Sequence, residues 1–231
     1  MNEVTCCQGL RAVRQRIQAA ALAVGRDPGT IRLLAVSKTQ DQARLREAIA
    51  CGQLAFGENY AQEFLDKHAA LAEWPLEWHF IGPLQANKTR VIAERAAWVH
   101  SLEREKIARR LDEQRPPELP PLNVCIQVNI DGQASKSGVG VADIEPLAAT
   151  LTQLPRLRLR GLMAIPTPSQ DPAAQRRPFA ALRAAYEDLR RLGFELDTLS
   201  MGMSADLDAA VAEGATLLRI GSAIFGPRPP K

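Results

Sequence analysis

The sequence predicts an α/β fold, a single (β/α)8 barrel of the TIM type with an extra N-terminal helix. Eight short apolar segments alternate with helical patterns along the 231 residues. That length is close to the ~250 residues typical of this barrel. The alternative is an open, doubly wound sheet, which more often has a Gly-rich phosphate loop after its first strand. The first apolar segment here ends in VSKTQ, residues 36–40, without such a loop.

The chain begins with a predicted helix, because apolar residues from Leu10 to Val24 fall at helical spacing. Gly25 and Pro28 end that helix. Short apolar runs then predict strands that are buried on both faces, as in a parallel sheet. The expected strands cover residues 31–36, 53–56, 76–81, 97–100, 122–130, 157–163, 195–199 and 216–220.

Helical patterns lie between these strands, and Thr39 and Gln42 resemble a capping box before the first of them. After the last strand only residues 221–231 remain, so we expect a short or missing eighth helix. The N-terminal helix is expected to cover that side of the barrel. We interpret residues 1–231 as one domain. The expected helices cover residues 41–50, 59–72, 85–95, 103–114, 143–154, 172–192 and 204–213.

Composition narrows the class of protein. Hydrophobic residues make up 46% and support a sizeable core, and the net charge of +3 is spread along the chain. This pattern favours neither nucleic acid nor an anionic membrane as a partner. No segment approaches the ~20 apolar residues of a membrane span, and no signal-peptide pattern opens the chain. We therefore expect a soluble cytoplasmic protein.

Cysteines and histidines give no sign of a metal site. The histidines His68, His79 and His100 lack the spacing of ligands on one helix face, and no C-x-x-C pair occurs. The four cysteines are expected to be free thiols in a reducing compartment. They are Cys6, Cys7, Cys51 and Cys125.

Polar residues follow three strands that would be neighbours in a closed barrel: the first, seventh and eighth. Lys38 follows the first strand, and Ser204 lies in the SMGMSADL segment after the seventh. Gly221 and Ser222 follow the eighth. Barrels frequently bind phosphate in the loops after strands seven and eight. Arg219, inside the apolar eighth strand, needs a partner for its charge.

Each of these residues has a simpler explanation when taken alone. Ser204 is more often a helix cap, Gly221 a turn residue and Lys38 a solvated charge. Together they place an amine, a phosphate-binding loop pair and a guanidinium at one end of the barrel. That combination suits pyridoxal 5'-phosphate (PLP), with an imine on Lys38, the phosphate in the loops and Arg219 at the pyridine nitrogen.

Seven motifs then make the sequence recognisable, over residues 33 to 228. The chain resembles the pyridoxal phosphate homeostasis protein family, which is related to the barrel domain of alanine racemase. The resemblance implies that Lys38 carries PLP as a Schiff base and that Arg219 faces the ring nitrogen. It also implies phosphate contacts from Ser200, Ser204, Gly221 and Ser222, and a place for Asn59 in the pocket. The motifs are LLAVSKTQ, FGENYAQE, WHFIGPLQANK, VNIDGQASKSGV, LRGLMAIP, LSMGMSADL and LRIGSAIFG.

Two positions depart from the pattern of some family members. Gln40 stands where some members have a second lysine, so a secondary cofactor-transfer role at that position is lost. Gln133, near Lys136, stands where some have glutamate. Neither departure touches the expected cofactor contacts.

The resemblance leaves more than one function open. Arginine at the pyridine nitrogen disfavours the ring proton that makes PLP a strong electron sink, which argues against aminotransferase chemistry. Alanine racemase takes its second acid/base from a tyrosine of a C-terminal β-domain, and we expect this barrel to lack that domain. We interpret Tyr186 as a packing residue, and Tyr60 as either a packing residue or a phosphate contact.

Our first interpretation is therefore a non-catalytic, monomeric protein that binds PLP and takes part in its homeostasis, with no catalytic residue and with PLP-dependent apo-enzymes as candidate partners. A racemase of weak or narrow activity is the second interpretation. The third is a barrel that binds another phosphorylated metabolite.

Overall fold

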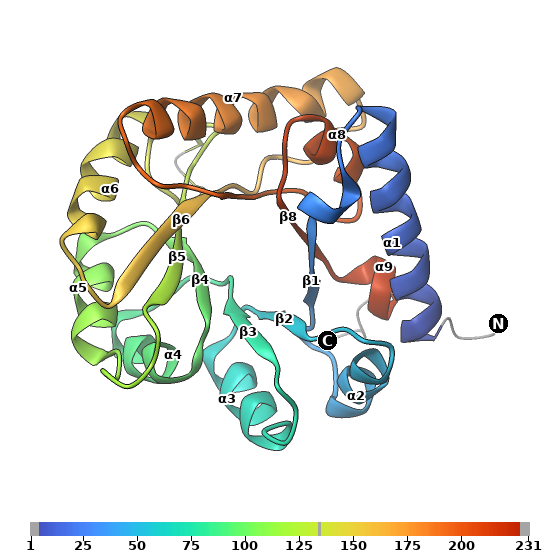
Figure 1. Ribbon diagram of the computed structural model, residues 1–231, viewed down its shortest axis with the longest axis horizontal. Coiled ribbons are helices and arrows are strands. Elements are labelled where there is room, and N and C mark those ends of the chain that lie inside the picture. Colours follow the sequence, from blue (N-terminus) through green and yellow to red (C-terminus); the bar gives the residue numbers. More distant parts are fainter. Residues whose placement is uncertain (1–4, 134, 227–231) are drawn as a thin grey trace.

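Eight parallel strands close into a barrel, paired in chain order, in the computed structural model (Figure 1). The structure describes residues 5–133 and 135–226. The predicted fold class is confirmed. The strands are β1 (Arg32–Val36), β2 (Ala55–Glu58), β3 (Glu77–Phe80), β4 (Trp98–Leu102), β5 (Leu122–Gln127), β6 (Leu157–Met163), β7 (Thr198–Ser200) and β8 (Leu217–Ile220).

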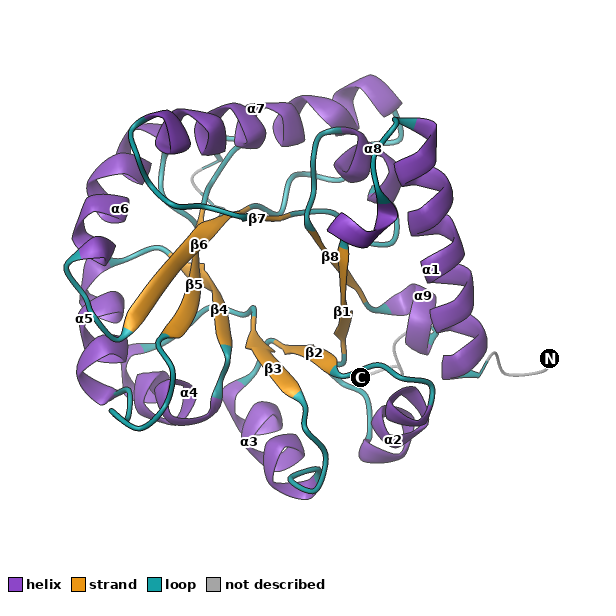
Figure 2. Cartoon of the chain, in the orientation of Figure 1, coloured by secondary structure: helices purple, strands orange, loops and turns teal. Residues whose placement is uncertain are grey.

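Helices surround the strands, and Figure 2 shows them as an outer ring. The main apolar core lies where the helices pack on the outer face of the strands. Within the described residues no helix is long and apolar enough to cross a membrane. The helices are α1 (Cys6–Ala23), α2 (Gln42–Ala50), α3 (Ala61–Ala70), α4 (Thr89–Arg95), α5 (Glu105–Gln114), α6 (Ile144–Thr152), α7 (Pro172–Arg191), α8 (Leu207–Ala212) and α9 (Ser222–Phe225), with 3-10 turns at Pro28–Thr30, Ala86–Lys88 and Val141–Asp143.

Pairing between β1 and β8 closes the barrel. Leu34 lies opposite Arg219 and Ala35 opposite Ile220, while the other edge of β1 pairs with β2. Because β8 and β1 are parallel, their carboxyl ends lie at the same end of the barrel. This end, which we call the mouth, is where the sequence places Lys38 and Gly221.

The helix α1 covers the side of the barrel at β8 and β1, as expected (Figure 1). Thr5 and Gln8 begin it with a capping box. Gly9 lies so close to α9 that a Cβ atom there would meet the carbonyl oxygen of Ile224 at 2.5 Å. Since α9 is a single turn, the expectation of a short eighth helix is also confirmed.

Several predicted element boundaries are wrong by two or three residues, and the predicted capping residue of α2 is also wrong. The strand β5 ends three residues earlier than expected, and β7 begins three residues later. The strand β2 runs on to a buried glutamate, Glu58, which the expected end at residue 56 leaves out. Asp41 rather than Thr39 caps α2, accepting a hydrogen bond from the Arg44 amide. The helix α8 begins at Leu207, three residues later than Ser204, because residues 203–206 form a loop.

The expectation of four free thiols is wrong for one pair. Cys7 on α1 and Cys51 at the end of α2 form a disulfide, with Cα atoms 5.5 Å apart. The two helices pack side by side, which brings together residues 44 positions apart. Sequence spacing alone cannot reveal that proximity. Cys6 and Cys125 are free and buried.

Candidate functional site

A cavity of about 250 Å³ lies at the mouth. The strand ends of β1, β2 and β8 and the loop after β7 bring its polar residues together. Six of the seven predicted site residues line it, and Ser200 does not. The six are Lys38, Asn59, Ser204, Arg219, Gly221 and Ser222.

Two serines face each other across the loops after β7 and β8. The hydroxyl oxygens of Ser204 and Ser222 lie 3.3 Å apart. Glycine shapes the first of these loops: Gly202 has φ 92°, and a Cβ atom there would meet the Cβ of Ala210 at 2.5 Å. The pair of hydroxyls forms a small polar hollow that could accept an anionic group such as phosphate.

Outer helices hold both loops in place. Arg16 of α1 donates to the Ser204 carbonyl oxygen at 2.7 Å and forms an ion pair with Asp208. Arg44 of α2 donates to the carbonyl oxygen of Phe225 at 2.9 Å, at the end of α9. The N-terminal helix is therefore a direct support of the candidate site as well as a cover for the barrel.

Arg219 is buried and donates hydrogen bonds to two neutral partners. One terminal nitrogen donates to the Ser200 hydroxyl at 2.8 Å, and the other donates to the Ala164 carbonyl oxygen at 2.8 Å. Burial lowers the pKa of this guanidinium to about 10, so it stays protonated at neutral pH. The expectation that this charge needs partners is confirmed, and they fix the guanidinium at the floor of the cavity.

Ser200 belongs to a hydrogen-bonded chain inside the barrel. Its hydroxyl lies 2.7 Å from Nδ1 of His100, and Nε2 of His100 lies 2.9 Å from Nδ1 of His79. Nε2 of His79 lies 2.6 Å from the Glu77 carboxylate. The Ser200 side chain is fully buried. In this arrangement it contacts the guanidinium of Arg219, and its hydroxyl does not reach the cavity.

The direction of each hydrogen bond in this chain follows from the groups at its two ends. Burial lowers the pKa of His79 and places that of His100 well below its ordinary value, so both rings are neutral at pH 7. Arg219 can only donate, and the ionised Glu77 can only accept. Each intervening group therefore accepts from the Arg219 side and donates towards Glu77. This chain was not predicted from the sequence, although two histidines inside apolar strands are a signal of it.

Asn59 brings an unused acceptor to the cavity. Its Oδ1 atom is buried and has no hydrogen-bond partner among the described residues. A buried acceptor without a partner carries a free-energy cost, which a ligand's donor would remove.

Neither tyrosine offers an acid or base to the cavity. Tyr60 is 56% exposed and does not line the cavity. Tyr186 is buried and donates to the Leu196 carbonyl oxygen at 2.8 Å. The interpretation of Tyr186 as a packing residue is confirmed. In the described part of the chain, no three His, Cys, Asp or Glu side chains gather as metal ligands.

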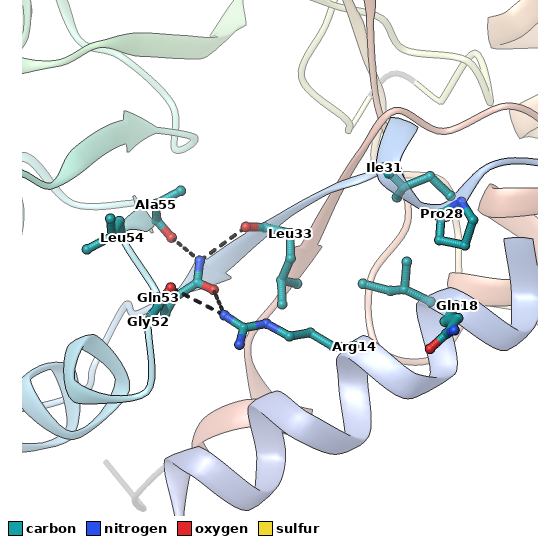
Figure 3. Close-up of a pocket in the computed structure, with 11 residues that line it drawn as sticks. Arg14, Gln18, Pro28, Ile31, Leu33, Gly52, Gln53, Leu54 and Ala55 are labelled. Carbon is teal, nitrogen blue, oxygen red and sulfur yellow. Dashed lines mark hydrogen bonds between the residues drawn. The ribbon is translucent and has the colours of Figure 1, made fainter.

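A second, larger groove of about 550 Å³ lies at the opposite end of the strands, between α1 and the start of β1 and β2 (Figure 3). Two of its polar side chains, Arg14 and Gln53, bind each other and nearby carbonyl groups. Arg14 donates to the Gly52 carbonyl and the Gln53 side-chain oxygen, while the Gln53 amide donates to the carbonyl oxygens of Leu33 and Ala55. Arg14 and Gln53 already have partners, whereas Asn59 at the mouth has a buried acceptor without one among the described residues, so the mouth is the better candidate site despite its smaller volume.

The comparisons with known proteins agree with this architecture. A family model described as alanine racemase, N-terminal domain, matches residues 9–229. The fold and the site thus define a barrel of the alanine racemase type. The chain belongs to the pyridoxal phosphate homeostasis protein family, because curated relatives of that name match almost its full length.

Two of these relatives come from well-known bacteria. One, from Pseudomonas aeruginosa, is 60% identical over 224 residues, which cover 97% of this chain and 96% of the relative. One from Escherichia coli K12 is 51% identical over 231 residues, covering 99% and 98%. The structure of PipY from Synechococcus elongatus PCC7942 with PLP bound is 35% identical, with a TM-score of 0.84, and covers 96% of this chain and all of that one.

The buried histidines should make stability depend on pH. The pKa values of His79 and His100 in the folded protein lie below the ordinary value of about 6.5. Below pH 6.5 the unfolded chain therefore binds more protons than the folded protein does. The stability they contribute is complete above that pH and is lost below it. Each histidine can contribute a slope of up to about 1.4 kcal/mol per pH unit. We expect His100→Gln to flatten the fall in unfolding free energy between pH 7.5 and 5.5, measured by chemical denaturation.

The same substitution at His68, which is only half-buried, is the control and should flatten the curve less. Equal pH slopes for the wild type and His100→Gln would show that His100 is not held neutral by the barrel.

Proposed function

We propose that this protein binds PLP at the mouth as a Schiff base on Lys38 and serves in PLP homeostasis as a holder of the cofactor rather than an enzyme. The observation that carries the proposal is the meeting of an amine, a fixed guanidinium and a pair of facing hydroxyls in one cavity. Homeostasis proteins related over nearly the full chain, and the PLP-bound PipY structure, support the same assignment.

The donor set suits each part of the cofactor. PLP supplies an aldehyde that reacts with a primary amine, and Lys38 is the lysine among the residues that line the cavity. The hydroxyls of Ser204 and Ser222 would hold the phosphate, together with the backbone at Gly221. Gly221 lies close to β1, since a Cβ atom there would meet the Val36 carbonyl oxygen at 3.1 Å.

Arg219 would face the pyridine nitrogen and keep it unprotonated, because two positive charges at that contact repel each other. Ser200, predicted as a phosphate contact, is reassigned as the residue that orients Arg219. The hydrogen-bonded groups from Ser200 to Glu77 direct the hydroxyl proton of Ser200 towards His100. The oxygen atom of Ser200 therefore stays available as an acceptor for the guanidinium.

We favour a protein that holds PLP over an enzyme because the described residues that line the cavity include no second acid/base on the opposite face from Lys38. Racemisation needs a proton donor on each face of the substrate, and neither tyrosine lines the cavity. A positioned acid or base typically contributes 10²–10⁴-fold to rate. We therefore expect this protein to release its bound PLP to acceptor apo-enzymes rather than to turn over amino acids with it.

Lys38 should carry the covalent label. Borohydride treatment of the PLP-loaded protein, followed by peptide mapping, should place the pyridoxyl group on the peptide that contains Lys38. Lys38→Ala should abolish the near-visible absorption band, because a Schiff base requires the primary amine. The exposed Lys88 provides the control, and Lys88→Ala should retain the band. A label found chiefly on Lys136 or Lys88 would disprove the assignment.

The serine pair should recognise the phosphate. Ser204→Ala combined with Ser222→Ala removes two hydrogen bonds to a charged group, each worth about 1.5–3 kcal/mol. Titration should show a much greater loss of affinity for PLP than for pyridoxal, which lacks the phosphate. Thr152→Ala, an exposed position on α6, controls for the loss of a hydroxyl. Equal losses for the two ligands would place the phosphate elsewhere.

The PLP-loaded protein should show no amino-acid turnover at an enzymatic rate. Each L-amino acid is incubated with it in deuterated water, and Cα exchange and formation of the D-isomer are followed. Turnover within the typical enzyme range of ~1–10³ s⁻¹ on any amino acid would favour the racemase interpretation. In a parallel assay, addition of the loaded protein to a PLP-dependent apo-enzyme should restore its activity, and Lys38→Ala should restore none.

A further inference from the structure

The residues on either side of Lys38 form an unusual turn. The Ser37 carbonyl oxygen accepts from the Gln40 amide at 3.0 Å, so residues 37–40 form a β-turn with Lys38 at its second position. Thr39, at the third position, has φ 64°. A turn of this pattern normally has glycine or asparagine there, since a β-branched residue rarely adopts positive φ. Within the described residues Thr39 is the only non-glycine residue with positive φ.

A buried lysine on α3 holds one side of this turn. Lys67 is 5% exposed, and its ammonium donates to three oxygen atoms. They are the Ser37 carbonyl at 2.7 Å, the Glu58 carboxylate at 2.8 Å and the Glu63 carboxylate at 3.0 Å. Three donors meet three acceptors, so the charge is fully used and its direction is fixed.

The two carboxylates reach the same turn. Glu63 accepts from the Thr39 amide at 2.8 Å, and Glu58 accepts from the Ser37 hydroxyl at 2.6 Å. Both neighbours of Lys38 in the chain are thus bound to one cluster of three charged side chains: Lys67, Glu58 and Glu63.

Stability alone does not account for this cluster. Glu58 is fully buried, and one of its oxygen atoms has no partner among the described residues. Burial raises the pKa of Glu58, and Lys67 opposes that effect. Buried ion pairs often contribute less to stability than apolar residues of similar size would. An energetically costly cluster beside a strained turn indicates a positional role, because unusual backbone angles persist only where the surroundings impose them.

We propose that Lys67, Glu58 and Glu63 are positioning residues that impose the turn at residues 37–40 and thereby direct the Lys38 amine into the mouth. The inference extends the proposed function, in which Lys38 binds PLP. Without the cluster, Thr39 would relax to negative φ, and the peptide that carries Lys38 would rotate. The amine would then be presented to the cavity in only a fraction of the molecules.

The central test replaces Lys67 with methionine, which has a similar length and no charge. In the Lys67→Met variant we expect the dissociation constant of PLP to rise about tenfold or more, as for the loss of a hydrogen bond to a charged group. Arg115→Met is the matched control. Arg115 is also buried and also binds backbone carbonyls, those of Ala93, Ala96 and Pro120, but it does not line the mouth.

A rescue experiment separates positioning from general support of the fold. Thr39→Gly permits positive φ without strain, so the turn no longer depends on the cluster. Added to Lys67→Met, it should restore at least half of the lost affinity on a logarithmic scale. If Lys67 only supports the fold, Thr39→Gly will restore nothing, and that result would overturn the proposal.

A second variant keeps the test open if Lys67→Met does not fold. Glu63→Ala removes the acceptor of the Thr39 amide at a position whose side chain is 32% exposed. Its control is Glu105→Ala, because Glu105 also lies in the first turn of its helix and pairs with a cation four residues on. We expect Glu63→Ala to weaken PLP binding and Glu105→Ala to leave it unchanged.

Hydrogen exchange of the Thr39 amide tests the turn without any cofactor. Exchange should accelerate about tenfold or more in Glu63→Ala and Lys67→Met, which weaken the bond that protects this amide. It should stay unchanged in the two controls. Unchanged exchange in both folded variants would overturn the positioning role even if Lys38 binds PLP. A wild-type protein that carries no label on Lys38 would instead disprove the proposed function, while Thr39 exchange would still report on the turn.

Discussion

The pairing of β8 with β1 is the constraint on which the rest of the molecule depends. It joins the two ends of the sheet, so that the interior has no open edge and every strand lies between two neighbours. It also determines which residues can meet. Leu34 lies opposite Arg219, and the chain reaches Lys38 four residues after Leu34, just past the end of β1. A barrel closed with another register would separate the amine from the loops after β7 and β8.

Arg219 and Lys67 are both buried cations, and their surroundings differ. Arg219 keeps its charge against neutral partners, from which a chain of neutral groups extends to the ionised Glu77. Lys67 is instead held between two carboxylates and a carbonyl. The first arrangement leaves a positive charge available at the cavity, while the second neutralises one beside it. Arg219 lines the cavity in which a ligand would bind, whereas Lys67 does not line it and binds protein oxygen atoms.

The sequence predicts the order of strands and helices and the closure, because buried parallel strands appear as apolar runs and the loops between them as polar ones. It also predicts five residues of the cavity, since residues at the ends of neighbouring strands must meet at the mouth, and the family resemblance adds Asn59. It does not predict that Ser200 is buried away from the cavity, because a serine at a strand end can face the mouth or the interior and only the packing decides. The cluster around Lys67 joins three segments, so no local pattern reveals it.

The position of α1 has a consequence for the order in which the molecule assembles. This helix takes the place that an eighth outer helix would fill, so the barrel resembles one whose sequence has been circularly permuted. Its Arg16 binds the Ser204 carbonyl across 188 residues of sequence, and its Gly9 packs against α9. Such contacts have a high contact order and a large entropic cost of loop closure. During synthesis the helix can pack on α2 early, but it can complete the burial of its apolar face only after α8 and α9 have been made.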